Sequence, residues 1–180
     1  MKPAIIAAVF AMALAMTAPN VCAAEQNQTP AQKAALQKAN AERLSQFLAA
    51  NGSIVHMTFK QNEKVPTNFS GVMKDGLKYC DALEVVFGAS PDNTITVLVY
   101  PHVDGHYLNI EKARDSIDML KQMAHFTGDN FMSWGADKDG DVFARYVITL
   151  ESGFPDEAMK VVLYSIAPND LFAQQLNYFM

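Results

Sequence analysis

A strand-turn-strand pattern between residues 131 and 150 constrains the fold of this chain more than any other feature. Two apolar segments, 131–136 and 141–150, flank the sequence Asp137-Lys138-Asp139-Gly140. Asp-Gly supplies the positive backbone φ angles that tight hairpin turns require. The second segment alternates apolar and polar residues with the period of a half-buried strand. The pattern predicts a β-hairpin, and with it an antiparallel sheet that has one solvated face.

Helical and extended patterns follow one another along the rest of the chain. Thr29, Pro30 and Gln32 form a capping box with proline at the first helical position, which predicts a helix over residues 30–50. Three segments rich in apolar, β-branched and aromatic residues predict strands, namely residues 53–60, 77–88 and 94–103. A shorter segment, residues 69–73, predicts a further strand.

The second half of the chain predicts three more helices. The central one spans residues 109–128, with Asn109 as its cap. Its apolar residues recur at three- and four-residue steps, and we expect this stripe to face the core: Ile110, Ala113, Ile117, Leu120 and Ala124. Two further helices are predicted to begin at Pro155 and at Pro168.

The resulting order of elements is α-β-β-β-α-β-β-α-α. Strands that are joined by hairpins, with helices between the two groups, predict an α+β fold. We expect a largely antiparallel sheet of about five strands that is covered by helices. Because the sequence has no internal repeat, linker or low-complexity segment, residues 29–180 are predicted to form a single domain.

Residues 1–24 have the features of a cleaved secretory signal peptide. Lys2 gives a charged start, residues 4–16 form a short apolar segment, and Cys22 and Ala24 are small residues that precede a cut after Ala24. Lipidation of Cys22 fits less well, because Pro19-Asn20-Val21 lacks the small residues of a lipoprotein signal. Residues 25–28 are then a flexible lead-in, and the mature chain is predicted to be periplasmic or secreted through Gram-negative-type export.

Composition excludes several classes of partner. The chain has a net charge of −5 and no cluster of Lys and Arg, which argues against nucleic acid, because such binding needs a basic patch. No segment reaches the ~18–20 apolar residues of a membrane-spanning helix, so stable membrane insertion is not expected. Only Cys80 remains after the predicted cleavage, so an intrachain disulfide is also excluded.

Three acidic residues in the hairpin turn are spaced like the first ligands of a calcium-binding loop. Asp137, Asp139 and Asp141 match the first positions of an EF-hand loop. Such a loop requires Gly at its sixth position and Glu at its twelfth, where this chain has Val142 and Ile148. The segment therefore favours a solvated hairpin turn over an ion site.

Catalytic and metal-binding patterns are weak elsewhere. His102 and His106 are four residues apart, but Pro101 and Gly105 place them in a loop, and no third ligand follows at a familiar spacing. Cys80 has no sequence neighbour that would activate it as a nucleophile. We assign no catalytic, cofactor-binding or metal-binding residue from the sequence, and the roles of Cys80, His102 and His106 stay open.

The second half of the chain resembles the YbjN family. The resemblance rests on the predicted central helix, Asn130-Phe131-Met132, the acidic turn at 137–141, the strand that ends at Leu150, and Glu151-Ser152-Gly153 before the next helix. It extends over roughly residues 30–178 and is sharpest over 109–166. Many members carry a tryptophan-asparagine pair before the central helix, where this chain has Leu108-Asn109.

The resemblance implies a fold like that of type III secretion chaperones and a tendency to bind proteins or to form dimers. It implies no catalytic residues. The chain is then a secreted member of a family whose better-known relatives are cytoplasmic regulators.

These observations lead to one principal hypothesis and two alternatives. The principal hypothesis is a non-enzymatic periplasmic protein, without a cofactor, that binds another protein through the exposed side of its sheet and its central helix. One alternative is a periplasmic immunity protein that neutralises a secreted toxin. The other is a small-ligand binder or an enzyme that uses Cys80 or the pair His102 and His106.

Overall fold

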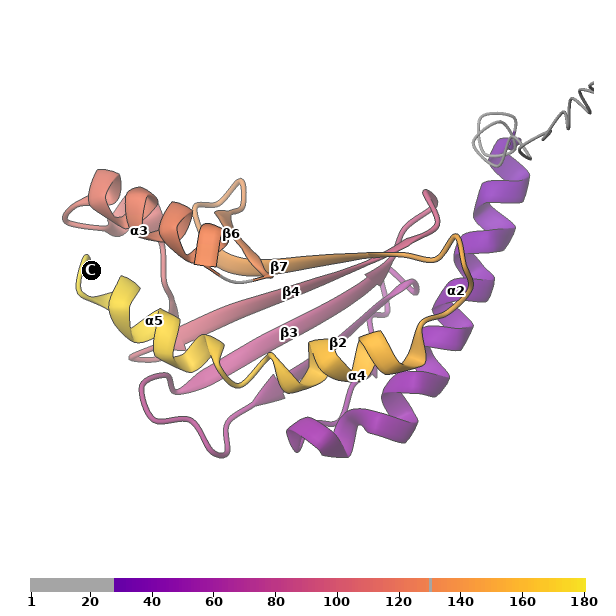
Figure 1. The fold of residues 1–180 in the computed structure, drawn as a ribbon, viewed down its shortest axis with the longest axis horizontal. Helices are drawn as coiled ribbons and strands as arrows, with labels where there is room; N and C mark the ends of the chain where they lie inside the picture. The colour runs from indigo at the N-terminus through magenta and orange to yellow at the C-terminus, as the bar shows by residue number, and fades with distance from the viewer. Residues whose placement is uncertain (1–27, 130) are drawn as a thin grey trace, which may run out of the picture.

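The protein has an α+β architecture, in which helices cover one antiparallel sheet. The structure is a computed structural model that describes residues 28–129 and 131–180. The predicted signal peptide and residues 25–27 lie outside the described residues. Within the described part of the chain, four α-helices accompany a sheet of seven strands, and Figure 1 shows the strands running side by side behind α4 and α5. The predicted fold class is confirmed.

Groups of strands and helices alternate as predicted, but among residues 28–129 five strands lie between the first and the central helix, where three were expected. The helices are α2 (Pro30–Asn51), α3 (Ser116–Asp129), α4 (Asp156–Tyr164) and α5 (Asn169–Asn177), with the short 3-10 helices η1 (Gly52–Val55) and η2 (Ile110–Lys112). The strands are β1 (Lys60–Gln61), β2 (Asn68–Met73), β3 (Ala82–Ala89), β4 (Thr94–Val103), β5 (His106–Tyr107), β6 (Ser133–Ala136) and β7 (Val142–Thr149).

The sheet is antiparallel throughout and has the order β1-β2-β3-β4-β7-β6, with β5 paired to the end of β4. The predicted hairpin is present as β6 and β7, with Gly140 at a φ of 79° in its turn. After β4 the chain passes through α3 to the edge strand β6 and returns as β7 beside β4. This connection places β4 at the centre of the sheet.

Helices cover one side of the sheet, which we call the inner face. α2 packs on β3, α5 on β4 and α3 on β6. The capping box at the start of α2 is present, since the Thr29 hydroxyl accepts the Gln32 amide and the Gln32 side chain accepts the Thr29 amide. The inner-face side chains that are fully buried belong to the three central strands and are Leu83, Val85, Phe87, Ile95, Val97, Val99, Val142 and Ala144.

The strand predicted over residues 53–60 is wrong except at Lys60. Residues 52–55 form η1, and His56 follows in the left-handed region with a φ of 51°. The chain folds back here because Gly52 has no side chain: a Cβ at this position would lie 2.6 Å from the Met57 carbonyl oxygen. The short segment predicted at 69–73 is confirmed as β2.

Asn109 begins a different element from the one predicted. Its side-chain oxygen accepts the amides of Glu111 and Lys112 at 3.0 and 3.3 Å, so it caps η2, and α3 starts only at Ser116. Its side-chain nitrogen donates to the Asp139 carbonyl and the Asp141 carboxylate at 2.9 and 2.8 Å. Asn109 therefore joins η2 to the turn of the β6–β7 hairpin.

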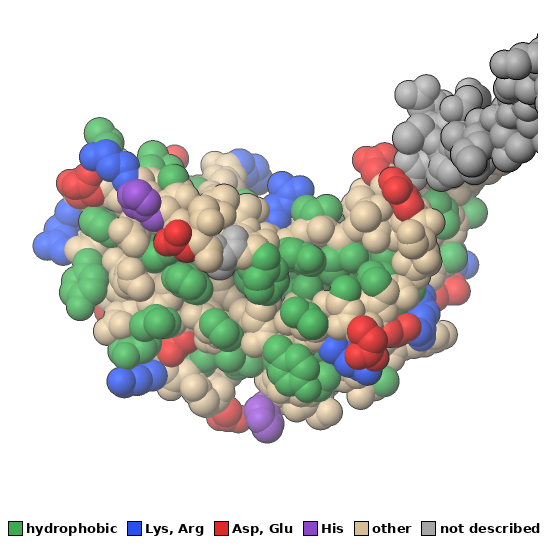
Figure 2. Space-filling model, viewed as in Figure 1, with side chains coloured by type: hydrophobic (Ala, Val, Ile, Leu, Met, Phe, Trp, Pro, Cys, Tyr) green, Lys and Arg blue, Asp and Glu red, His purple; other side chains and the backbone are tan. Residues whose placement is uncertain are grey.

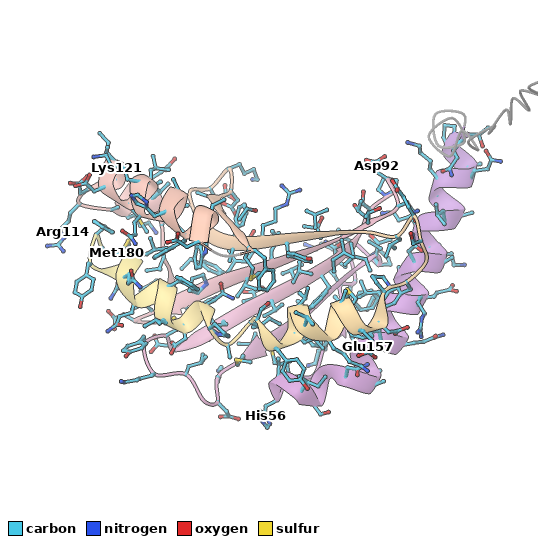
Figure 3. All side chains as sticks on the ribbon, viewed as in Figure 1. His56, Asp92, Arg114, Lys121, Glu157 and Met180 are labelled. Carbon is cyan, nitrogen blue, oxygen red and sulfur yellow. The ribbon has the colours of Figure 1, made fainter. Side chains whose placement is uncertain are left out.

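Polar contacts fasten the C-terminal residues to the start of α3. The backbone amide of Arg114 donates to the Phe179 carbonyl, and its guanidinium donates to the Tyr178 carbonyl, each at 2.8 Å. Figure 3 shows Arg114 and Met180 at the same end of the molecule. These bonds hold α5 beside α3.

Candidate functional site

The side of the sheet opposite the helices, which we call the outer face, is the first candidate site. Its side chains are half-buried or exposed, in alternation with the buried residues of the inner face. Register aligns them in rows across β2, β3, β4 and β7. One row contains Asn68, Gly88, Thr96 and Val147, and the next contains Ser70, Val86, Leu98 and Arg145.

A groove of about 340 Å³ lies on this face above Gly88. Val65 and Asn68 border it on one side, and Thr96 and Leu98 on the other. The groove depends on the glycine, because a Cβ at Gly88 would come within 2.9 Å of the Asn68 side-chain oxygen.

A polar and aromatic cluster lies at the other end of the outer face. The Tyr107 hydroxyl donates to the Glu84 carboxylate at 2.5 Å, and His102 Nε2 lies 3.5 Å from the same carboxylate oxygen. Nε2 is buried and has no hydrogen-bond partner among the described atoms, so the 3.5 Å approach is an electrostatic contact. The rings of His102 and Tyr107 are 4.2 Å apart, and Tyr100 packs edge-on against Tyr107.

The carboxylates beside these tyrosines keep their hydroxyls protonated. The hydrogen bond to Glu84, followed by burial, raises the pKa of Tyr107 above its usual range. Burial and the nearby Asp137 carboxylate raise the pKa of Tyr100 to about 12. Both hydroxyls therefore remain hydrogen-bond donors at neutral pH.

The two histidines of the predicted pair do not form one site. His102 pairs with Tyr107 and belongs to the outer-face cluster, whereas His106 pairs with Val103 and is exposed. Successive residues of β4 and β5 point to opposite sides, so the hairpin separates the two imidazoles. The sequence indicated neither Glu84 nor Tyr107 as a neighbour of His102, because register alone brings them together.

Cys80 is a buried thiol held in a structural arrangement. The Asp170 carboxylate accepts the backbone amides of Lys78, Tyr79 and Cys80 at 2.8, 2.9 and 2.7 Å. Burial, reinforced by Asp170, raises the pKa of the thiol to about 12. A thiol with this pKa is not a thiolate at neutral pH, and the thiolate is the nucleophilic form.

The acidic turn is used for structure. The Asp137 carboxylate accepts the amides of Asp139 and Asp141 at 3.0 and 3.1 Å, and the Asp141 carboxylate accepts from Asn109. Among residues 28–129 and 131–180, no group of three or more His, Cys, Asp or Glu side chains could hold a metal ion. The same residues contain no helix that is long and apolar enough to cross a membrane.

The second candidate site is the solvent side of α3. The buried residues of α3 are Met119, Met123 and Phe126, which corrects the expectation that Ile117, Leu120 and Ala124 face the core. The other two members of the predicted stripe, Ile110 and Ala113, lie before α3 and do pack against the core. Ile117 is 66 % exposed and Leu120 is 51 % exposed, one turn apart. We call Ile117, Leu120 and Ala124 the α3 stripe, and they make α3 apolar on both of its sides.

Further hydrophobic side chains reach the surface beside the helices. Figure 2 shows them gathered between β7 and α4. Among the exposed hydrophobic residues, Phe131 is half exposed and packs edge-on against Tyr146, with 5.4 Å between the ring centroids. The Trp134 indole nitrogen, by contrast, is buried without a hydrogen-bond partner among the described atoms and lies between Phe126 and Phe172.

Comparison with known proteins adds no family to these observations. Neither the models of known protein families nor the curated protein sequences contain a match to this chain. The fold and the two candidate sites define an α+β protein with an open sheet face and a doubly apolar helix. The resemblance to the YbjN family stays a prediction.

Proposed function

We propose that this protein is a non-enzymatic, periplasmic protein-binding domain, and that the α3 stripe is the surface that contacts its partner. The observation that carries the proposal is the exposure of Ile117 and Leu120 on a helix whose opposite side is already packed in the core. Large apolar residues that lie together in solvent mark interaction sites.

The surroundings of the stripe fit a protein partner. Arg114 and Asp115 come just before the stripe in the sequence. Asp118 and Lys121 lie between its members and form an ion pair with each other. A mixed polar rim around an apolar centre is typical of protein-protein interfaces. An amphipathic helix or another apolar segment of a partner protein fits this surface best.

Affinity capture from periplasmic extract tests the proposal. The bait is the purified chain, and the test variant is Ile117→Asp with Leu120→Asp. The matched control is Val161→Asp with Tyr164→Asp, which places the same two charges on exposed apolar positions of α4. We expect one protein to be retained by the wild type and the control and lost from the α3 variant. Equal retention by all three baits, or no retained protein, would contradict the proposal.

The identity of the retained protein separates the two protein-binding hypotheses. A secreted toxin encoded beside this chain would identify an immunity protein. A partner with no toxic activity would favour a chaperone-like or regulatory role.

A small-ligand binder is the second candidate, and it rests on the unpartnered Nε2 of His102 beside Glu84 and Tyr107. Native mass spectrometry of the chain purified from periplasm distinguishes the two. A co-purified small molecule that is absent from the His102→Ala variant would favour the ligand hypothesis. Its persistence in that variant, or its absence from the wild type, would contradict it.

A further inference from the structure

The outer face of the sheet has the features of a self-complementary surface. We propose that two copies of this chain associate through their outer faces about a two-fold axis that runs along β4. This inference goes beyond the proposed function, because it uses the sheet and leaves the α3 stripe free.

The first support is the position of a ridge and a groove. β7 presents Val147, which is 45 % exposed, and its edge neighbour β6 presents only Ser133 and Gly135 on the same side. β7 therefore stands out as a ridge. The groove above Gly88 follows β3, on the other side of β4.

The register places ridge and groove symmetrically. Val147 and Gly88 belong to the same row, and both pair with Thr96 of β4. A two-fold axis along β4 places β7 of one protomer over β3 of its partner, so each Val147 faces the other copy's groove. A two-fold interface requires this reciprocity. The usual ~30° angle between packed sheets displaces strands one spacing from the axis by only about 2 Å.

The second support is charge. Arg145 is exposed on the outer face and forms no ion pair with any described residue. Its row contains Val86, and Glu84 precedes Val86 by two residues on the same side of β3. In the two-fold arrangement each guanidinium comes within reach of the partner's Glu84 carboxylate. An interface would then contain this complementary pair twice.

The third support is area. The strands β2, β3, β4, β7 and β6, with a rise of ~3.3 Å per residue and a spacing of ~4.8 Å, give an outer face of about 570 Å² per protomer. Specific interfaces bury at least ~1,200 Å² in total. The outer face alone therefore comes close to the lower limit of what a specific dimer needs, and we expect reversible association.

Sedimentation equilibrium of the purified chain tests the inference. We expect a monomer-dimer equilibrium, and Val147→Asp should weaken it about 100-fold, because each dimer then buries two unpaired carboxylates. Val161→Asp on α4 is the matched control and should leave association unchanged. Arg145→Gln should remove most of the salt dependence of association. A monomer at all concentrations, or a dimer that tolerates Val147→Asp, would overturn the inference.

Cross-linking locates the axis independently of stability. Thr96→Cys places a thiol on the axis, where two packed sheets hold the backbones about 10 Å apart and the facing thiols closer than that, within the span of a short bis-maleimide. We expect a cross-linked dimer for Thr96→Cys and none for Val161→Cys, and the opposite result would also overturn the inference. The α3 variant used for partner capture should still dimerise, so failure of one proposal leaves the other testable.

Discussion

The two faces of the sheet are built from alternate residues of the same strands, yet they differ in how completely their polar and apolar groups are satisfied. On the inner side, Val85 and Phe87 are fully buried and the Asp170 carboxylate of α5 receives three backbone amides. On the outer side, Val147 is in solvent and Glu84 shares one oxygen between Tyr107 and His102. The inner side is therefore committed to stability, although the Trp134 indole nitrogen has no hydrogen-bond partner among the described atoms. The outer side retains an exposed valine and an unpartnered His102 nitrogen that can bind.

Two carboxylates should show the largest difference between the sides. Asp170→Asn exchanges one acceptor oxygen for a donor that faces backbone amides, and we expect it to lower the free energy of unfolding by about 3 kcal/mol. Glu84→Gln removes an outer-face charge that has one hydrogen bond, and we expect a loss of about 1 kcal/mol. Urea denaturation measures both. Equal losses of unfolding free energy in the two variants would contradict the difference between the two sides of the sheet.

Adjacent valines of β3 provide a smaller, better matched contrast. Val85→Ala removes two methyl groups from the inner face, and we expect a loss of about 2.5 kcal/mol. Val86→Ala makes the same change on the outer face, where the site is already partly hydrated, and we expect about 0.5 kcal/mol. Both unfolding curves should be recorded at concentrations that keep the chain monomeric. A greater loss at Val86 would show that the outer face is covered within the monomer.

The hydroxyl of Tyr107 should contribute less to the free energy of unfolding than the side chain of the buried Val85. Tyr107→Phe removes the hydrogen bond to Glu84, and we expect a loss of about 1 kcal/mol. Tyr178→Phe is the control, since this tyrosine lies in solvent, and it should leave the unfolding midpoint unchanged. A loss at Tyr107 as small as at Tyr178 would indicate that water replaces the hydroxyl without cost.

The smallest of these effects should be the loss of stability just above pH 9. The ordinary pKa values are 9.0 for the Cys80 thiol and 10.0 for Tyr100, and both rise to about 12 in the folded chain, through burial above all. The folded chain thus holds these protons to a higher pH than the unfolded chain does. Their stabilisation is complete below pH 9 and declines as the pH rises toward 12. Unfolding midpoints measured across this range should fall less steeply with pH in Cys80→Ala than in the wild type. An unchanged slope would contradict the contribution of the Cys80 thiol to this pH dependence.

The parts of this fold that local signals determine were predictable from sequence. The capping box at Thr29, the Asp-Gly turn and the alternation of residues 94–103 each act over a few residues and were confirmed. The segment at 53–60 alternates equally well, but the close approach of the Met57 carbonyl to Gly52 decides its conformation. That contact depends on chain reversal and has no signature in hydrophobic period.

The candidate sites were harder to predict because they depend on distant partners. The sequence of α3 contains two apolar stripes, and only packing against β6 and α5 decides which one is buried. Asp170 and Cys80 are 90 residues apart in sequence, so nothing near Cys80 indicated its carboxylate neighbour. His102 was singled out from sequence, but Glu84 joins it through strand register.

The hydrogen bonds from Arg114 to the Tyr178 and Phe179 carbonyls make residues 178 and 179 necessary for holding α5 beside α3. Exoproteolytic trimming of residues 178–180 would remove both acceptors and release the loop that leads into α3. Tags and fusion partners are therefore better attached upstream of Thr29 than after Met180, where they would strain the hydrogen bonds that hold α5 in place.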